Sequence, residues 1–247
     1  MRTENNPGSG LLLLLVLPLL SACVANTAEE NDPLQGVNRV IYNINDGLDR
    51  ALIKPVATAY SKVAPKGVRM GVTNFFDNVS YINVIANDLL QGKFQQAAND
   101  TGRFLLNSTA GVGGIFDIAS GAGLAKHDED LGQTFGTWGA SEGVYLVIPL
   151  FGPNSVRDAP DLATSALLNP LFYVTTSVTL PLGVVNAINK RANLLEATRI
   201  RDEAALDAYS FTREAYRQNR EYKIYDGNPP TPDLEYIEEE DGVLKVY

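Results

Sequence analysis

The chain has 247 residues, of which 45% are hydrophobic and 20% charged, a composition typical of a folded protein with a sizeable core. The net charge of −9 at pH 7 argues against a nucleic-acid partner, because phosphate binding requires a basic surface. One cysteine and one histidine leave no pair for a disulfide and too few ligands for a structural zinc site, so we expect neither a metal nor a cofactor.

The N-terminus carries a targeting segment. Residues 11–20 are apolar except for the break at Pro18. They reach about half of the roughly 20 residues that a spanning helix needs, a length typical of a signal-peptide core. Residues 20–23 (LSAC) resemble the bacterial lipobox, whose cysteine is acylated after cleavage. We therefore expect residues 1–22 to be a lipoprotein signal peptide and Cys23 to carry the acyl chains that anchor the protein to a membrane. A free thiol after an apolar run is the alternative.

The two ends of the mature chain are predicted to lack regular structure. Residues 23–35 form an acylated tether, polar and without periodicity. The ten residues 24–33 extend to about 35 Å. By resemblance to lipoprotein sorting rules, Val24, a residue other than aspartate, allows transfer to the outer membrane. Residues 226–247 combine prolines with an excess of acidic side chains, which predicts a disordered acidic tail.

Between these ends the apolar spacing is helical and alternation of period two is scarce, so the predicted fold class is all-α. An apolar stripe from Val37 to Leu52 predicts a long first helix that Pro55 ends or kinks. Ser80 is expected to cap a second helix that Gly92 closes. Three further helices are predicted over residues 94–108, 182–207 and 208–225.

Three stretches interrupt the helical pattern with glycine- or proline-rich apolar loops. Residues 109–124 carry five glycines. Residues 136–153 contain a short apolar run, 144–148, that suits a hairpin or an exposed apolar loop. Residues 167–182 are apolar and bracketed by prolines. The last two stretches are too short to span a bilayer, but both can enter one leaflet.

Candidates for catalysis are few, and we expect no enzyme. His127 lies in the polar run 126–130 (KHDED), which predicts a solvated loop. The acidic residues of that run lack the ligand spacing of an EF-hand. There is no Gly-x-Ser-x-Gly elbow, and the glycines at 111–114 lack the spacing of a dinucleotide-binding loop.

Short blocks of sequence follow one another along the chain in an order that resembles the MlaA (VacJ) lipoprotein family. The first is residues 31–39 (NDPLQGVNR). The others include residues 88–92 (DLLQG), 103–109 (RFLLNST), 132–136 (GQTFG), the pair Arg157-Asp158, and residues 213–216 (REAY). The resemblance covers about residues 31–225 and is weakest in the signal n-region and the acidic tail.

The resemblance implies a ring-like helical domain over residues 36–225. The ring would lie in the inner leaflet of the outer membrane of a Gram-negative bacterium, on the periplasmic side. Its channel would remove mislocalised phospholipid from the outer leaflet and pass it to the periplasmic carrier MlaC, maintaining lipid asymmetry. Porin trimers are the implied membrane partners. The alternative is a structural lipoprotein that tethers or braces porins without moving lipid, and the single histidine disfavours a lipid hydrolase.

A phospholipid channel needs a polar path for the headgroup, because an unpaired charge in an apolar environment is costly. Five polar side chains on otherwise apolar helices are candidates to line that path: Asn38, Asn45, Asn83, Asn87 and Arg103. The alternative is that they bond helix ends and loops. Glycines permit backbone movement, and a predicted gate comprises Asn43, Ile44, Gly139, Gly143, Tyr145 and Leu146.

Overall fold

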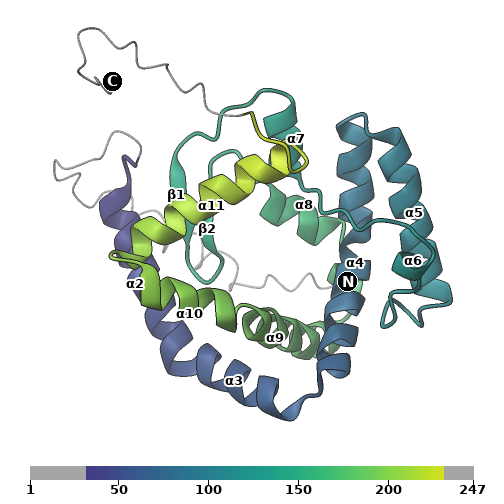
Figure 1. Ribbon diagram of the computed structural model, residues 1–247, viewed down its shortest axis with the longest axis horizontal. Coiled ribbons are helices and arrows are strands. Elements are labelled where there is room, and N and C mark those ends of the chain that lie inside the picture. Colours follow the sequence, from purple (N-terminus) through teal and green to yellow (C-terminus); the bar gives the residue numbers. More distant parts are fainter. Residues whose placement is uncertain (1–31, 231–247) are drawn as a thin grey trace, which may run out of the picture.

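The computed structural model describes residues 32–230, which form a ring of helices with one small β-hairpin (Figure 1). The predicted all-α fold class is confirmed. The predicted signal peptide 1–22, Cys23, most of the tether and most of the acidic tail lie outside the described residues.

The first side of the ring is a long irregular helix. It consists of α2 (Gln35–Leu48), a π-helical turn η2 (Asp49–Ile53) and α3 (Lys54–Val63). The helix therefore continues beyond Pro55, which lies in the first turn of α3. The wide turn immediately before it already interrupts the regular hydrogen-bond ladder, so the missing N–H of proline breaks little.

The opposite side is a pair of antiparallel helices, α4 (Lys66–Leu90) and α5 (Phe94–Thr109). The prediction that Ser80 caps α4 is wrong. The helix begins fourteen residues earlier, and the Ser80 hydroxyl donates to the carbonyl of Phe76 at 3.0 Å. Gly92, with a φ of +76°, ends the helix as predicted.

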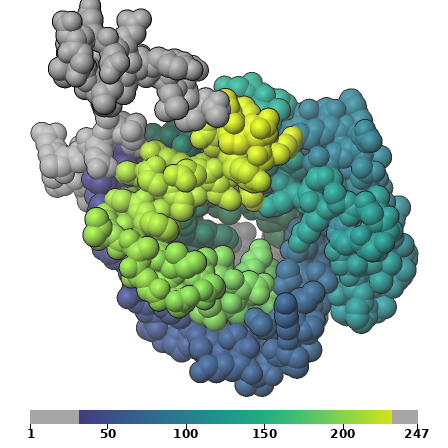
Figure 2. Space-filling model, viewed as in Figure 1, coloured from purple at the N-terminus to yellow at the C-terminus, as the bar shows by residue number. Residues whose placement is uncertain are grey.

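The remaining elements connect the two sides and close the ring. They are α6 (Ile118–Gly121), α7 (Leu131–Thr137), the antiparallel strands β1 (Tyr145–Ile148) and β2 (Gly152–Ser155), α8 (Asp161–Leu167), the 3₁₀ turn η3 (Pro170–Tyr173), α9 (Thr176–Asn193), α10 (Leu195–Ala204) and α11 (Ala208–Ile224). The predicted helix over 182–207 is thus two helices that meet at Leu194, and the first of them begins at Thr176. Figure 2 shows an opening through the ring, bordered by α9, α10 and α11 on one side and by α4 on the other.

The apolar stripe of the first helix faces outward. Val40, Ile44, Leu48 and Leu52, four residues apart, are all more than 40% exposed. The buried apolar cluster is small by contrast: Tyr145, Val147 and Tyr209, with three half-buried neighbours. The interior is instead rich in buried asparagine, aspartate and arginine side chains. The ring therefore exposes an apolar surface along α2 while its interior is held largely by hydrogen bonds, unlike an ordinary soluble domain.

Within residues 32–230, none of the helices combines the length and the apolar character that crossing a bilayer would require.

Candidate functional site

Two asparagines of α2 bind the free edge of the hairpin. Asn38 donates to the Tyr145 carbonyl at 3.0 Å and accepts from the Val147 N–H at 2.9 Å. Asn45, two turns later, donates to the Ile148 carbonyl at 3.0 Å and accepts from the Leu150 N–H at 2.9 Å. A spacing of seven residues places both amides on one face of the helix. The helix therefore supplies β1 with the partner that a third strand would otherwise give.

The start of the described chain joins the same junction. Asp32, fully buried, accepts from the Asn38 amide at 3.1 Å, from the hydroxyl of Tyr209 and from Arg213 at 3.3 Å. Burial and the Asp32 carboxylate raise the pKa of Tyr209, so its hydroxyl remains a donor. Tyr42 packs edge-on against Tyr209 at 5.7 Å. The hairpin, α2 and α11 are thus fixed to one another.

A second polar junction joins α4 to α7 and α8. Asn87 donates to the Asn83 carbonyl at 2.9 Å and accepts from the Thr134 hydroxyl at 2.8 Å. Asn83 reaches Asp161, whose carboxylate also accepts from the N–H of Leu131 at 3.1 Å. These bonds satisfy amides that the sequence places on an apolar helix.

Arg103 holds the glycine-rich loop 110–124. Its guanidinium donates to the Tyr81 hydroxyl at 2.8 Å, to both oxygens of Asp117 at 3.0 Å, and to the Leu124 carbonyl. Burial acts to raise the pKa of Asp117, but hydrogen bonds from Ser120, and from Asn107 and Arg103, hold it down to about 2. The carboxylate is therefore ionised throughout the physiological range.

The five candidate lining residues do not form one surface. Asn38, Asn83, Asn87 and Arg103 are all at least 93% buried, and Asn45 is half-buried. Each of them bonds helix ends, loops or neighbouring side chains, as the alternative interpretation states. In this structure they support the walls of the ring rather than line its opening, and a direct lining role stays a prediction.

The candidate gate residues are divided between two places. Asn43 and Ile44 are exposed on the outer face of α2, whereas Tyr145 is fully buried and Leu146 half-buried in β1. Gly139 and Gly143, with φ of +88° and +69°, flank the loop between α7 and β1. Only the glycines belong to a loop whose backbone can change without breaking a helix or strand.

That loop borders a cavity of about 830 Å³ on one side of α11. Side chains of both charges line it. Arg217 lies 3.4 Å from the Glu142 carboxylate and 4.0 Å from that of Glu214. Arg157 and Arg220, which also line the cavity, pair with Asp158. Burial raises the pKa of Glu142 although Arg217 and Arg157 oppose it. Such a cavity offers both donors and acceptors to a zwitterionic group.

The sequence did not predict a buried charged cluster where α4 and α5 meet the loop before α7. The expectation of a solvated run at 126–130 holds for Lys126 and Asp128, which are exposed, but not for Glu129, which is 4% exposed and accepts from Lys93 at 2.9 Å. His127 lies 2.9 Å from the buried Asp100 carboxylate. Burial, and then the neighbouring Asp100, raise the pKa of Asp88 to about 7. The acidic residue inside the DLLQG block was the only sequence signal for this cluster.

Comparisons with known proteins agree with this architecture. A family model described as MlaA lipoprotein matches residues 30–223. The chain is 31% identical over 217 residues to the intermembrane phospholipid transport system lipoprotein MlaA of Shigella flexneri, covering 85% of this chain and 86% of the relative. It is 32% identical over 206 residues to an uncharacterized protein of Rickettsia bellii, covering 83% and 81%. A solved structure described as the structural basis for maintenance of bacterial outer membrane lipid asymmetry aligns with a TM-score of 0.70 at 30% identity, covering 81% of this chain and 100% of that one.

Proposed function

Because the chain belongs to the MlaA lipoprotein family, we propose that it is an outer-membrane lipoprotein through whose ring phospholipid passes, so that lipid asymmetry is maintained. The single observation that supports this best is the opening through the ring (Figure 2). The ring around it exposes many large apolar side chains and buries polar ones. Its relatives in Shigella flexneri and Escherichia coli are named as lipoproteins of an intermembrane phospholipid transport system.

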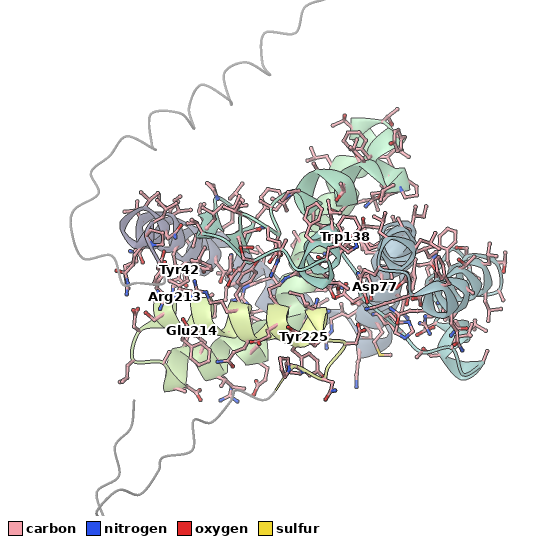
Figure 3. All side chains as sticks on the ribbon, turned by 90° about the horizontal axis from the view of Figure 1, so that it is seen from above. Tyr42, Asp77, Trp138, Arg213, Glu214 and Tyr225 are labelled. Carbon is pink, nitrogen blue, oxygen red and sulfur yellow. The ribbon has the colours of Figure 1, made fainter. Side chains whose placement is uncertain are left out.

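The two faces of the ring differ in a way that suits a membrane surface. The face built by α10 and α11 carries exposed ion pairs, such as Arg199 with Glu196 and Glu203, and lies below the ring in Figure 3. The outward stripe of α2 and the segment between α8 and α9 expose apolar side chains. In our proposal the charged face meets the periplasm and the apolar surfaces meet lipid.

Moving a phospholipid breaks no bond, so the protein needs no catalytic set. It needs surroundings that satisfy the headgroup while the tails stay in an apolar environment. We assign the headgroup's polar surroundings to the charged cavity beside α11. We further propose that lipid leaves toward a periplasmic carrier such as MlaC and that porin trimers surround the ring in the membrane.

The proposal is tested with purified full-length protein in vesicles that contain a fluorescent phospholipid in both leaflets. A membrane-impermeant reductant quenches only the outer leaflet, so lipid movement appears as quenching beyond about one half. We expect movement with the protein and none with protein-free vesicles. If vesicles with folded protein and no porin show no movement, the porin-bracing alternative is favoured instead.

The loop beside the cavity gives a matched test of gating. A Cβ built on Gly143 lies 3.2 Å from the Cβ of Val156, within reach of a disulfide. The double variant Gly143→Cys/Val156→Cys is measured oxidised and reduced, so that both forms share any strain at position 143. We expect oxidation to slow lipid movement and reduction to restore it. Equal movement in the two forms would remove the gate from the proposal.

A further inference from the structure

One long segment of the chain carries no charge. Residues 162–189, twenty-eight in a row, contain no Asp, Glu, Lys, Arg or His, although 20% of the whole chain is charged and about five or six such residues would be expected. Asp161 precedes the segment and Lys190 follows it. The segment comprises most of α8, the turn η3 and most of α9.

This segment rises from the ring as a hairpin. In Figure 3 the ring is seen edge-on, and the pale green α8, η3 and the beginning of α9 stand above it, on the side opposite α10 and α11. Figure 1 shows the ring face-on and α9 nearly end-on, so the axis of this helix is steeply inclined to the plane of the ring. The charged residues that bracket the segment therefore lie at its base, and η3 forms its tip.

The hairpin exposes apolar side chains on more than one side. At its tip Phe172 is 58% and Tyr173 72% exposed. Along α9, Val178 and Leu180 are 47% and 65% exposed, and a step of about 100° per residue places them on opposite sides of the helix. A docked protein covers one face of a helix, whereas lipid surrounds it. Apolar exposure all round is typical of a helix in an apolar medium.

Several polar groups near the tip are bonded within the hairpin. The Asn169 side chain accepts from the N–H of Leu171 at 2.9 Å, and the Tyr173 hydroxyl donates back to the Leu167 carbonyl at 2.7 Å. The backbone N–H of Phe172 bonds the Asn169 carbonyl at 2.9 Å. Pro170 has no N–H to satisfy. Polar groups in hydrocarbon must be bonded internally because no water is present, whereas polar groups in water can bond the solvent.

We propose that residues 162–189 form an apolar hairpin that inserts into the hydrocarbon interior of the bilayer and reaches about its mid-plane. The partner is the acyl chains of phospholipid, including those of the opposite leaflet, and not another protein. The twelve residues from Thr176 to Ala187 span about 18 Å as a helix, against about 15 Å for the hydrocarbon of one leaflet. This inference rests on the proposed membrane function and adds which segment lies deepest.

The depth is measured with a tryptophan placed at the tip. The chain has a single tryptophan, Trp138, which Trp138→Phe removes. In that background Phe172→Trp reports on the tip and Leu180→Trp on a position nearer the ring. Phe211→Trp, on α11 and 41% exposed, is the matched control on the charged face. The full-length protein is reconstituted without other proteins in vesicles of phosphatidylcholine brominated either near the headgroup or near the chain end.

We expect the indole at position 172 to be quenched most by bromine near the chain end, that at 180 more evenly by both, and that at 211 little by either. Circular dichroism spectra that match the parent's show that each variant is folded. The inference is overturned if positions 172 and 211 are quenched alike, or if position 172 becomes buried in lipid only when another membrane protein is added. Should the tip variant not fold, shallow quenching at position 180, equal to that at 211, overturns it equally.

Lipid movement measured on the same vesicles separates this inference from the proposed function. A shallow tip together with normal lipid movement overturns the hairpin alone. A deep tip without lipid movement overturns the transport function alone.

Discussion

Replacing Asp88 by asparagine should stabilise the protein at neutral and alkaline pH. The side chain is fully buried, and one of its oxygens accepts from the Gln96 amide at 2.7 Å. Among the described residues no donor reaches the other oxygen, which faces the buried Asp100. Ionisation of Asp88 is costly because the side chain is buried and lies beside a second carboxyl group. An amide at position 88 would donate to Asp100 and still accept from Gln96.

The size of the expected gain in stability follows from the pKa of Asp88. Burial and Asp100 raise the pKa of Asp88 from 3.8 to about 7, a difference of about 3 units. At 1.36 kcal/mol per unit, this amounts to at most about 4 kcal/mol. Since the pKa is raised on folding, the folded state retains a proton that the unfolded chain has lost. The stabilising contribution is complete below about pH 4 and disappears as the pH rises through 7. We expect Asp88→Asn to gain about 2 kcal/mol or more at pH 8, which is about 5 °C in Tm.

Thermal unfolding in mild detergent between pH 4 and 8.5 measures this effect. The matched control is Asp77→Asn, the same substitution on an exposed turn of α4, which removes only a surface ion pair with Lys126 worth less than about 1 kcal/mol. The variant at position 88 should match the parent at pH 4 and exceed it at pH 8. A variant less stable than the parent at pH 8, or one with the parent's pH dependence, would refute the raised pKa of Asp88.

Three further outcomes are expected. Arg103→Lys should lower the free energy of unfolding by about 3 kcal/mol in urea titrations, because lysine cannot bridge Tyr81, Asp117 and the Leu124 carbonyl together, whereas Arg199→Lys on the exposed face of α10 should change it little. Asn45→Ala should lower the free energy of unfolding by about 1–3 kcal/mol and expose the turn between β1 and β2 to protease. The control is Asn43→Ala, on the outer face of the same helix. Equal cleavage of the two variants would show that the hydrogen bonds of Asn45 do not hold the β1–β2 hairpin. Cys23→Ser should prevent acylation and release the protein into the soluble fraction after vesicle flotation; a variant still cleaved and firmly membrane-bound would contradict the lipobox.

Helix positions could be predicted from apolar spacing, but the direction of the apolar faces could not. The predicted helices over 94–108 and 208–225 agree with α5 and α11 within about a residue at each end. The apolar stripe of α2 is equally clear in the sequence, yet its members, such as Ile44, are exposed on the outer surface. The polar Asn38 on the other face of the helix is buried. A period of 3.6 residues shows that a helix has an apolar face and does not tell whether protein or lipid covers it.

Two other predictions, the cap at Ser80 and the solvated position of Glu129, were wrong because they rested only on neighbouring residues in the sequence. A serine before an apolar run is a helix cap when its backbone is extended, but Ser80 bonds the carbonyl four residues back and continues α4. The burial of Glu129 depends on Lys93 and Gln96, more than thirty residues away. Contacts at that separation cannot be predicted from the spacing of residues within one segment. The buried charged cluster and the bonds between α2 and the β1–β2 hairpin were therefore found only in the structure.

The hydrogen bonds that join Asn38 and Asn45 of α2 to the β1–β2 hairpin have a mechanical consequence. A two-stranded hairpin is marginally stable alone. Here four hydrogen bonds from Asn38 and Asn45 tie it to a helix whose opposite face is apolar and exposed. A shift of α2 by one residue in register would move both amides by about 1.5 Å along the helix axis and by about 100° around it, which would break all four bonds together. Because both amides lie on one rigid helix, the four bonds form or break together, and the β1–β2 hairpin is either held by α2 or released from it.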